Sequence, residues 1–173
     1  MNRGSIAVSG LFLLLVGCVL FAAHFFVCSL PYKQNVSGHL KQAADANSIP
    51  IAAERLEMAT KYLRDNGLTT GYTSIIYRTP DEDIGFWYNN LVSAQQQLRE
   101  VERNPNASPL ETTNVLMKLR ETLTDHGEKG GTEITEPNGI SRYPHNFLWG
   151  SVLTLASLLS FAGLIFLVGS MRD

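Results

Sequence analysis

IAVSGLFLLLVGCVLFAAHFFVCSL, residues 6–30, is a run of 25 residues without a single Asp, Glu, Lys or Arg. A helix of this length reaches about 37 Å, which exceeds the roughly 30 Å hydrocarbon core of a bilayer. A second charge-free run covers residues 147–168. The sequence therefore predicts two transmembrane helices, Ile6–Leu30 and Phe147–Val168, with the short ends 1–5 and 169–173 beyond them.

Between the two runs lies a polar segment, Pro31–Asn146, whose 116 residues are enough for one small domain. It carries 12 Lys or Arg and 15 Asp or Glu, with both signs interspersed. This balance gives no basic patch, so we expect no nucleic-acid partner. The expected fold class is all-α, with two transmembrane helices flanking an extracytoplasmic helical bundle of three to four helices.

The N-terminus decides the expected topology. Met1-Asn2-Arg3 ahead of a long apolar run is typical of a signal anchor. Residues 15–18 (LVGC) are similar to a lipoprotein cleavage motif, but the chain stays apolar after Cys18, where a lipoprotein becomes polar. Few Lys and Arg flank either span, and long polar segments are translocated largely regardless of charge. We expect cytoplasmic termini and an extracytoplasmic domain 31–146, most simply in a bacterial inner membrane.

Helical periodicity predicts four helices in the domain, at about 33–47, 51–65, 80–103 and 109–125, joined by a loop 66–79 and followed by a linker 126–143. Pro31 predicts either a break at the membrane exit or a first helix that extends the span outward. Asn66-Gly67 is a left-handed stop for the second helix. In the loop, Ile75 and Ile76 are expected to pack into the bundle.

Two helices are expected to begin with the same capping device. Thr79-Pro80-Asp81-Glu82 and Ser108-Pro109-Leu110-Glu111 each place a hydroxyl at the N-cap, Pro at the first helical position and Glu two residues later. The acidic trio Asp81-Glu82-Asp83 has the composition of a metal site. Consecutive carboxylates on a helix point in different directions, however, so we interpret the trio as charge at the positive end of the helix dipole.

The third helix carries a heptad pattern, with Ile84, Leu91 and Leu98 at one position and Trp87, Ala94 and Val101 at the other. The pattern is too short for a free coiled coil and predicts the central helix of a bundle. Phe86, Trp87 and Tyr88 form an aromatic cluster at its start. Two interpretations stay open for this cluster, packing in the core and contact with a partner.

His24 is the candidate ligand-binding residue within the first span, because an ionisable side chain at membrane depth is often functional. Cys28 lies one turn further on the same face, whereas Cys18 and Cys28 lie on different faces and cannot form a disulfide. A haem, pigment or metal site needs more ligands than these. We find no catalytic, nucleotide-binding or metal motif, and so predict a non-enzymatic protein without a cofactor.

The second span contains a stripe of small and hydroxyl residues at Gly150, Thr154, Ser157 and Ser160. Such side chains allow close helix approach and hydrogen bonds between helices in a bilayer. The stripe predicts either contact with another membrane protein or another copy, or packing on the chain's own first span, where Ser9, Gly10 and Gly17 offer a matching surface.

Together these features predict an accessory or scaffold subunit of a membrane complex or homo-oligomer, with the outer helical domain contacting a partner. The alternative is a membrane-embedded pigment, haem or small-molecule binder around His24. The order of span, helical domain and span also resembles the polysaccharide chain-length regulators of bacterial inner membranes in architecture, which implies a regulatory role. The domain here is shorter, and Pro137 and Pro144 do not form the proline-rich motif of that family.

Overall fold

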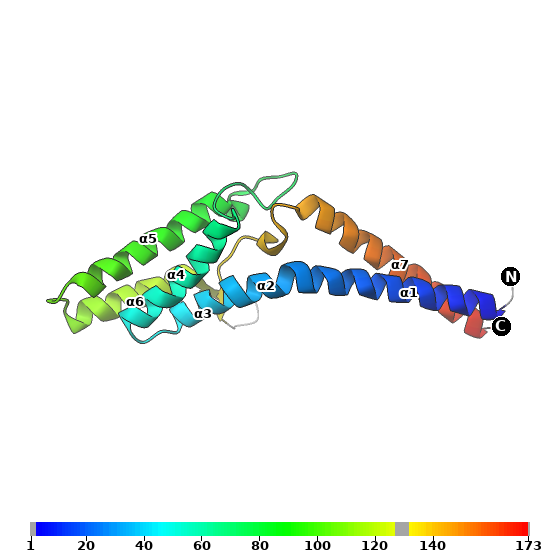
Figure 1. Ribbon diagram of the computed structural model, residues 1–173, viewed down its shortest axis with the longest axis horizontal. Coiled ribbons are helices and arrows are strands. Elements are labelled where there is room, and N and C mark those ends of the chain that lie inside the picture. Colours follow the sequence, from blue (N-terminus) through cyan, green and yellow to red (C-terminus); the bar gives the residue numbers. More distant parts are fainter. Residues whose placement is uncertain (1–2, 127–131, 173) are drawn as a thin grey trace. The chain divides into compact units, whose positions relative to one another are not determined.

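The computed structural model describes residues 3–126 and 132–172, and most of them are helical (Figure 1). The chain divides into two compact units, one formed by Met1–Leu30 with His145–Asp173 and the other by Pro31–Pro144. Within the described ranges, the sheet structure consists of one two-stranded hairpin and an isolated bridge. The predicted all-α class is therefore confirmed.

The first unit is a pair of helices, α1 (Arg3–His24) and α7 (Asn146–Arg172), each long and apolar enough to cross a membrane. They lie side by side near the two termini (Figure 1). At one close contact two glycines meet, since a Cβ added at Gly163 would lie 2.7 Å from the carbonyl oxygen of Gly10. About two turns further along α1, Gly17 faces Ala156 and Ser160 of α7. Any side chain at these glycines would push the helices apart.

Pro31 does not break the chain, because helical conformation continues from Arg3 to Ala44. Around the proline, π-helical turns over Phe25–Ser29 and Lys33–Ser37 flank a short α-helical segment, α2 (Leu30–Tyr32). Proline within a regular α-helix clashes with the carbonyl one turn earlier and lacks an N–H to donate. The wider π turn gives the ring room, so of the two predicted possibilities the helix extension is the one observed.

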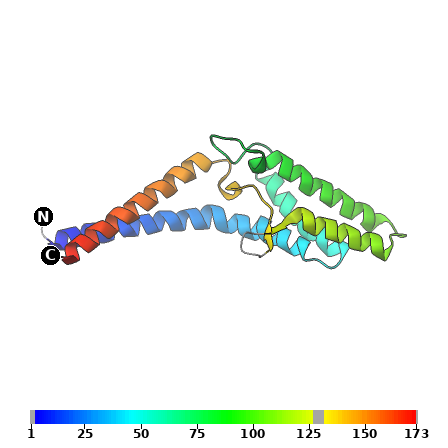
Figure 2. The ribbon, with the colours of Figure 1, turned by 180° about the vertical axis from the view of Figure 1, so that it is seen from behind.

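The second unit is a bundle of α3 (Gly38–Ala44), α4 (Ile49–Asp65), α5 (Ile84–Arg103) and α6 (Pro109–Leu123), which lie together in Figure 1 and Figure 2. Helix α4 packs on both α3 and α5, and α6 closes the bundle against the same two helices. The core comes mainly from fully buried aliphatic side chains: Val36, Leu40, Leu56, Leu63, Ile84, Leu91, Leu98 and Leu123.

The heptad pattern in α5 is confirmed. Ile84, Leu91 and Leu98 are buried, and Ala94 and Val101 pack against the core from partly buried positions. Two polar residues, Thr60 and Gln95, are buried in this core, where the Thr60 hydroxyl donates to the Leu56 carbonyl over 2.9 Å and lies 3.4 Å from the Gln95 side-chain oxygen. The pattern identified the correct face because burial in water selects apolar side chains at helical spacing.

Of the three helix-end signals predicted at Asn66-Gly67, Thr79 and Ser108, the first and the last are confirmed. Asn66-Gly67 forms the predicted stop, with Gly67 at φ +70° and the Leu68 N–H donating to the Leu63 carbonyl over 2.8 Å. At the start of α6, the Ser108 hydroxyl accepts from the Glu111 N–H over 3.1 Å, as expected of an N-cap. Both signals depend only on residues adjacent in sequence.

The predicted cap at Thr79 is wrong for α5. Residues Pro80–Glu82 form a separate 3₁₀ turn, and the N-cap of α5 is Asp83, whose carboxylate accepts from the Phe86 N–H over 3.1 Å. The Thr79 hydroxyl instead donates to the Glu82 side chain over 2.6 Å. The helix begins later than expected because Asp83 also pairs with Tyr72 in an isolated bridge. Asp83, the last residue of the acidic trio, is therefore the residue that caps α5.

The expectation that Ile75 and Ile76 pack into the bundle is also wrong, since 57% and 77% of their surfaces are exposed. Their loop is closed below them by two backbone hydrogen bonds, from Ile84 N–H to the Gly71 carbonyl (2.9 Å) and from Thr73 N–H to the Glu82 carbonyl (3.1 Å). These bonds hold the residues between them out of the bundle.

The predicted linker 126–143 is not a simple connection. Helix α6 ends at Leu123, and β1 (Thr124–His126) pairs antiparallel with β2 (Thr132–Ile134), with Asp125 opposite Glu133. Residues 127–131 of the predicted linker lie outside the described residues. After the hairpin, a 3₁₀ turn at Ile140–Arg142 buries Ile140 in the core. The described residues between α6 and the end of the unit, 124–126 and 132–144, are called the return segment below. They are therefore part of the folded unit.

Candidate functional site

An open groove of about 600 Å³ lies on the unit 31–144, between the first half of α5 and the return segment. Its lining comes from α5, the 3₁₀ turn before α5, the end of α6, the two strands of the hairpin and the residues after β2. The lining residues are Pro80, Asp81, Asp83, Phe86, Trp87, Asn90, Leu91, Thr122, Asp125, Glu133, Ile134, Thr135, Glu136, Pro137 and Asn138.

The groove is acidic. Five of its lining residues carry carboxylates, and none of the described residues that line it is Lys or Arg: the acids are Asp81, Asp83, Asp125, Glu133 and Glu136. They come from three separate stretches of sequence, which the hairpin brings together. Asp81 and Glu133 are exposed, whereas Asp83 caps α5. The negative potential of such a concave surface favours a cationic ligand.

Glu136 lines the groove and is also hydrogen-bonded to the helical stretch 30–44, which follows the first apolar run. Its carboxylate accepts hydrogen bonds from the Tyr32 hydroxyl (3.0 Å) and from the Ser37 hydroxyl (3.1 Å). Burial raises the pKa of Glu136, while the two hydroxyls and the nearby Lys33 ammonium partly offset this rise. No sequence pattern indicated this site, because Glu136 and Tyr32 are 104 residues apart.

The aromatic cluster of α5 divides between core and surface. Trp87 is buried, and its indole N–H donates to the Thr135 carbonyl over 2.8 Å, which ties α5 to the return segment. Tyr88 packs against the core from a partly buried position. Phe86 is 65% exposed and lines the groove. Packing thus accounts for Trp87 and Tyr88, and leaves Phe86 as an apolar contact available to a ligand.

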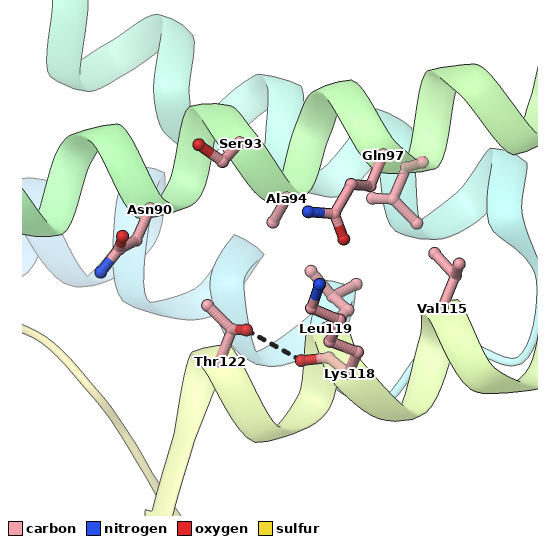
Figure 3. A pocket seen from close by; sticks show the side chains of 9 residues that line it. Asn90, Ser93, Ala94, Gln97, Val115, Lys118, Leu119 and Thr122 are labelled. Carbon is pink, nitrogen blue, oxygen red and sulfur yellow. Dashed lines mark hydrogen bonds between the residues drawn. The ribbon is translucent and has the colours of Figure 1, made fainter.

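A smaller groove of about 280 Å³ lies between α5 and α6. Its lining includes Asn90, Ser93, Ala94 and Gln97 of α5 and Val115, Lys118, Leu119 and Thr122 of α6, and Figure 3 shows the Gln97 amide pointing into the space between the helices. Asn90 and Thr122 line both grooves. The acidic groove therefore adjoins a polar one, and together they offer a longer surface along α5.

The small-residue stripe of the second span is divided between two faces of α7. Ser160 packs against Gly17 of α1. Thr154 and Ser157 are exposed and donate to the carbonyls of Gly150 and Leu153 in their own helix, each over 2.9 Å. A Cβ added at Gly150 would meet nothing within 4 Å. Contact with α1 therefore uses Ser160, whereas Thr154 and Ser157 are exposed and Gly150 has room for a side chain.

His24 lies within the helix pair, where its ring meets the Trp149 ring edge-on at a centroid distance of 5.5 Å. Neither Cys18 nor Cys28 forms a disulfide. Across residues 3–126 and 132–172, no three His, Cys, Asp or Glu side chains gather closely enough to hold a metal ion. His24 thus has an aromatic neighbour, and within the described ranges it belongs to no group of three or more such side chains.

Comparison of the chain with protein-family models, with curated proteins and with solved structures finds no match.

Proposed function

We propose that the chain is a non-enzymatic integral membrane protein, an accessory or scaffold subunit whose helical unit 31–144 binds a protein partner outside the cytoplasm. The two long apolar helices α1 and α7 support the membrane anchor. In water, their exposed side chains, among them Phe12, Val19, Leu158 and Phe161, would form a large apolar surface. Monomeric soluble proteins rarely expose such a surface, and a bilayer covers it.

The observation that carries the proposal is the acidic groove with Phe86 at its wall. Exposed carboxylates draw a cationic partner and set the orientation in which it approaches. An exposed aromatic ring next to a concave surface supplies the kind of apolar contact that dominates binding energy. We therefore propose a partner segment that carries Lys or Arg together with at least one apolar side chain.

The test replaces Phe86 with a photoreactive phenylalanine analogue in the full-length chain and irradiates native membranes. We expect a discrete crosslinked product whose yield falls when salt is raised, because rim charges are screened. The same yield should fall several-fold in the double variant Asp81→Lys, Glu133→Lys.

The matched control is Glu100→Lys with Glu102→Lys, which makes the same charge change on exposed residues of α5 outside the groove. It should leave the yield unchanged. Equal loss in both double variants would mean that net charge rather than the groove directs binding. Absence of any product at Phe86, with the protein correctly inserted, would contradict partner binding at this site.

A further inference from the structure

The loop between α4 and α5 carries an unusual surface feature at its tip. Ile75, Ile76 and Tyr77 are consecutive and are 57%, 77% and 82% exposed. Elsewhere in the described part of the unit 31–144, no two exposed large apolar side chains are adjacent in sequence. Single exposed apolar residues are normal on a protein surface, whereas a continuous group indicates contact with something apolar.

Hydrogen bonds hold the base of this loop, which we call its neck. They run from the Ile84 N–H to the Gly71 carbonyl and from the Thr73 N–H to the Glu82 carbonyl. Within the tip, the Tyr77 N–H donates to the Ser74 hydroxyl over 3.1 Å. Because these bonds use the backbone and leave the three apolar side chains outward, the loop presents them together.

Chain connectivity limits how far this neck is from the proposed membrane. The Tyr143 hydroxyl donates to the Thr70 carbonyl over 2.9 Å, and its ring lies against Gly71, so the neck is joined to Tyr143. Four residues later, Phe147 begins the apolar run of α7. Four residues reach at most about 14 Å. The headgroup layer on each side of a bilayer is roughly 5–8 Å thick, so a projection joined at Tyr143 is within reach of it.

We propose that the loop tip Ser74–Arg78 is a third membrane contact of this chain, in which Ile75, Ile76 and Tyr77 enter the interface of the bilayer that α1 and α7 cross. Aliphatic side chains, a tyrosine and a cation are the composition that favours this layer, since Tyr holds its hydroxyl among the headgroups and Arg78 meets lipid phosphates. The inference rests on the proposed membrane anchor, and is independent of the acidic groove and its partner.

The experiment uses the full-length chain in phosphatidylcholine and phosphatidylglycerol vesicles, with Cys18 and Cys28 replaced by alanine. A single cysteine, Ile76→Cys, carries an environment-sensitive fluorophore. Two quenchers are compared: iodide on both sides of the membrane, and lipid with a spin label near the headgroup end of its acyl chain. Asn106→Cys, in an exposed turn, serves as the aqueous control, and Leu158→Cys, exposed in the middle of α7, serves as the lipid control.

We expect spin-labelled lipid to quench the label at position 76 several-fold more than the label at position 106, and iodide to quench it less. A label at position 76 that behaves like the one at position 106 overturns the inference. Protection from both quenchers also overturns it, because protein would then cover the tip. If lipid quenches position 158 in either case, the anchor stands and only the loop assignment fails.

Discussion

The two units of this chain bury different kinds of residue. In the bundle the buried side chains are mainly Leu, Ile, Val and Ala, and they fill the space between α3, α4, α5 and α6. Between α1 and α7, the buried apolar positions are Gly10, Gly17, Ala156 and Gly163, whereas many large apolar side chains, among them Phe12, Leu158 and Phe161, are exposed. The same chain therefore uses large side chains to join helices in one unit and small ones in the other.

The difference follows from the proposed solvent of each unit. In water, burying apolar area gives about 25 cal/mol per Å², so large side chains stabilise a core. In lipid, this driving force between helices is absent, and close backbone approach with favourable van der Waals contact takes its place. In the proposed membrane, an exposed leucine on α7 contacts an apolar environment, as a buried leucine on α5 does.

The largest expected effect is in the bundle. Leu91→Asp puts a charge at a buried position of α5, at a cost of several kcal/mol, comparable with the roughly 5–15 kcal/mol stability of a domain. Limited proteolysis of the full-length chain should then show rapid cleavage within residues 31–144. Gln96→Asp, on the exposed face of the same helix, is the control. Equal protease resistance in the two variants would contradict the assigned core.

The second effect is in the helix pair. Gly163→Leu places a side chain where a Cβ alone would lie 2.7 Å from the Gly10 carbonyl oxygen, so α1 and α7 should separate at an overpacking cost of about 1–3 kcal/mol. Spin labels at positions 15 and 158, in the background lacking Cys18 and Cys28, measure the separation. Gly169→Leu is the control, because its Cβ meets nothing within 4 Å. A distance unchanged by Gly163→Leu would show that the glycines are not in contact.

The third effect distinguishes contacts inside the chain from contacts with another protein. Gly150→Leu with Ser157→Leu alters the outer face of α7, where Thr154 and Ser157 are exposed. Interhelical contacts in membranes contribute roughly 0.6–2 kcal/mol each, so we expect release from a detergent-stable complex. The label distance between positions 15 and 158 should stay the same. A parent chain that is monomeric in mild detergent and crosslinks to nothing would refute the assembly.

The smallest effect is the pH dependence contributed by Glu136. Because its pKa is raised in the folded unit, the native state holds this proton to higher pH than the unfolded state does. The free energy of unfolding should therefore fall as the pH rises from the ordinary glutamate pKa of 4.5 to the raised pKa of Glu136. The slope should correspond to a difference of less than one bound proton between the folded and unfolded states. Thermal unfolding followed by Trp87 fluorescence, with Glu136→Gln as comparison, measures it. A slope that persists in the glutamine variant belongs to other groups.

Much of the helical unit follows from its sequence, because its signals are local. The stripe Ile84, Leu91, Leu98 identifies the core face of α5, and Asn66-Gly67 marks the end of α4. The structure has α4 over Ile49–Asp65, where residues 51–65 were predicted. These features depend on residues within one or two turns of each other.

The acidic groove could not be predicted in the same way. Asp81, Asp125 and Glu136 are far apart in sequence, and the short hairpin that brings them together carries no strong strand pattern. Ile75 and Ile76 were assigned to the core from their hydrophobicity alone, whereas the neck hydrogen bonds of the loop decide their exposure. Likewise, Thr79 and Asp83 both have capping side chains, and the bridge between Tyr72 and Asp83 determines which of them caps α5.

The central claim is that α1 and α7 lie in lipid while the unit 31–144 lies in water. The most direct measurement compares thiol labelling of Leu158→Cys and Asn106→Cys in the background lacking Cys18 and Cys28. Both side chains are exposed in the structure, so protein packing protects neither. An impermeant reagent added to intact cells should label position 106, and position 158 should stay unlabelled even after the membranes are opened without detergent. Equal labelling of both positions in membranes would contradict the account.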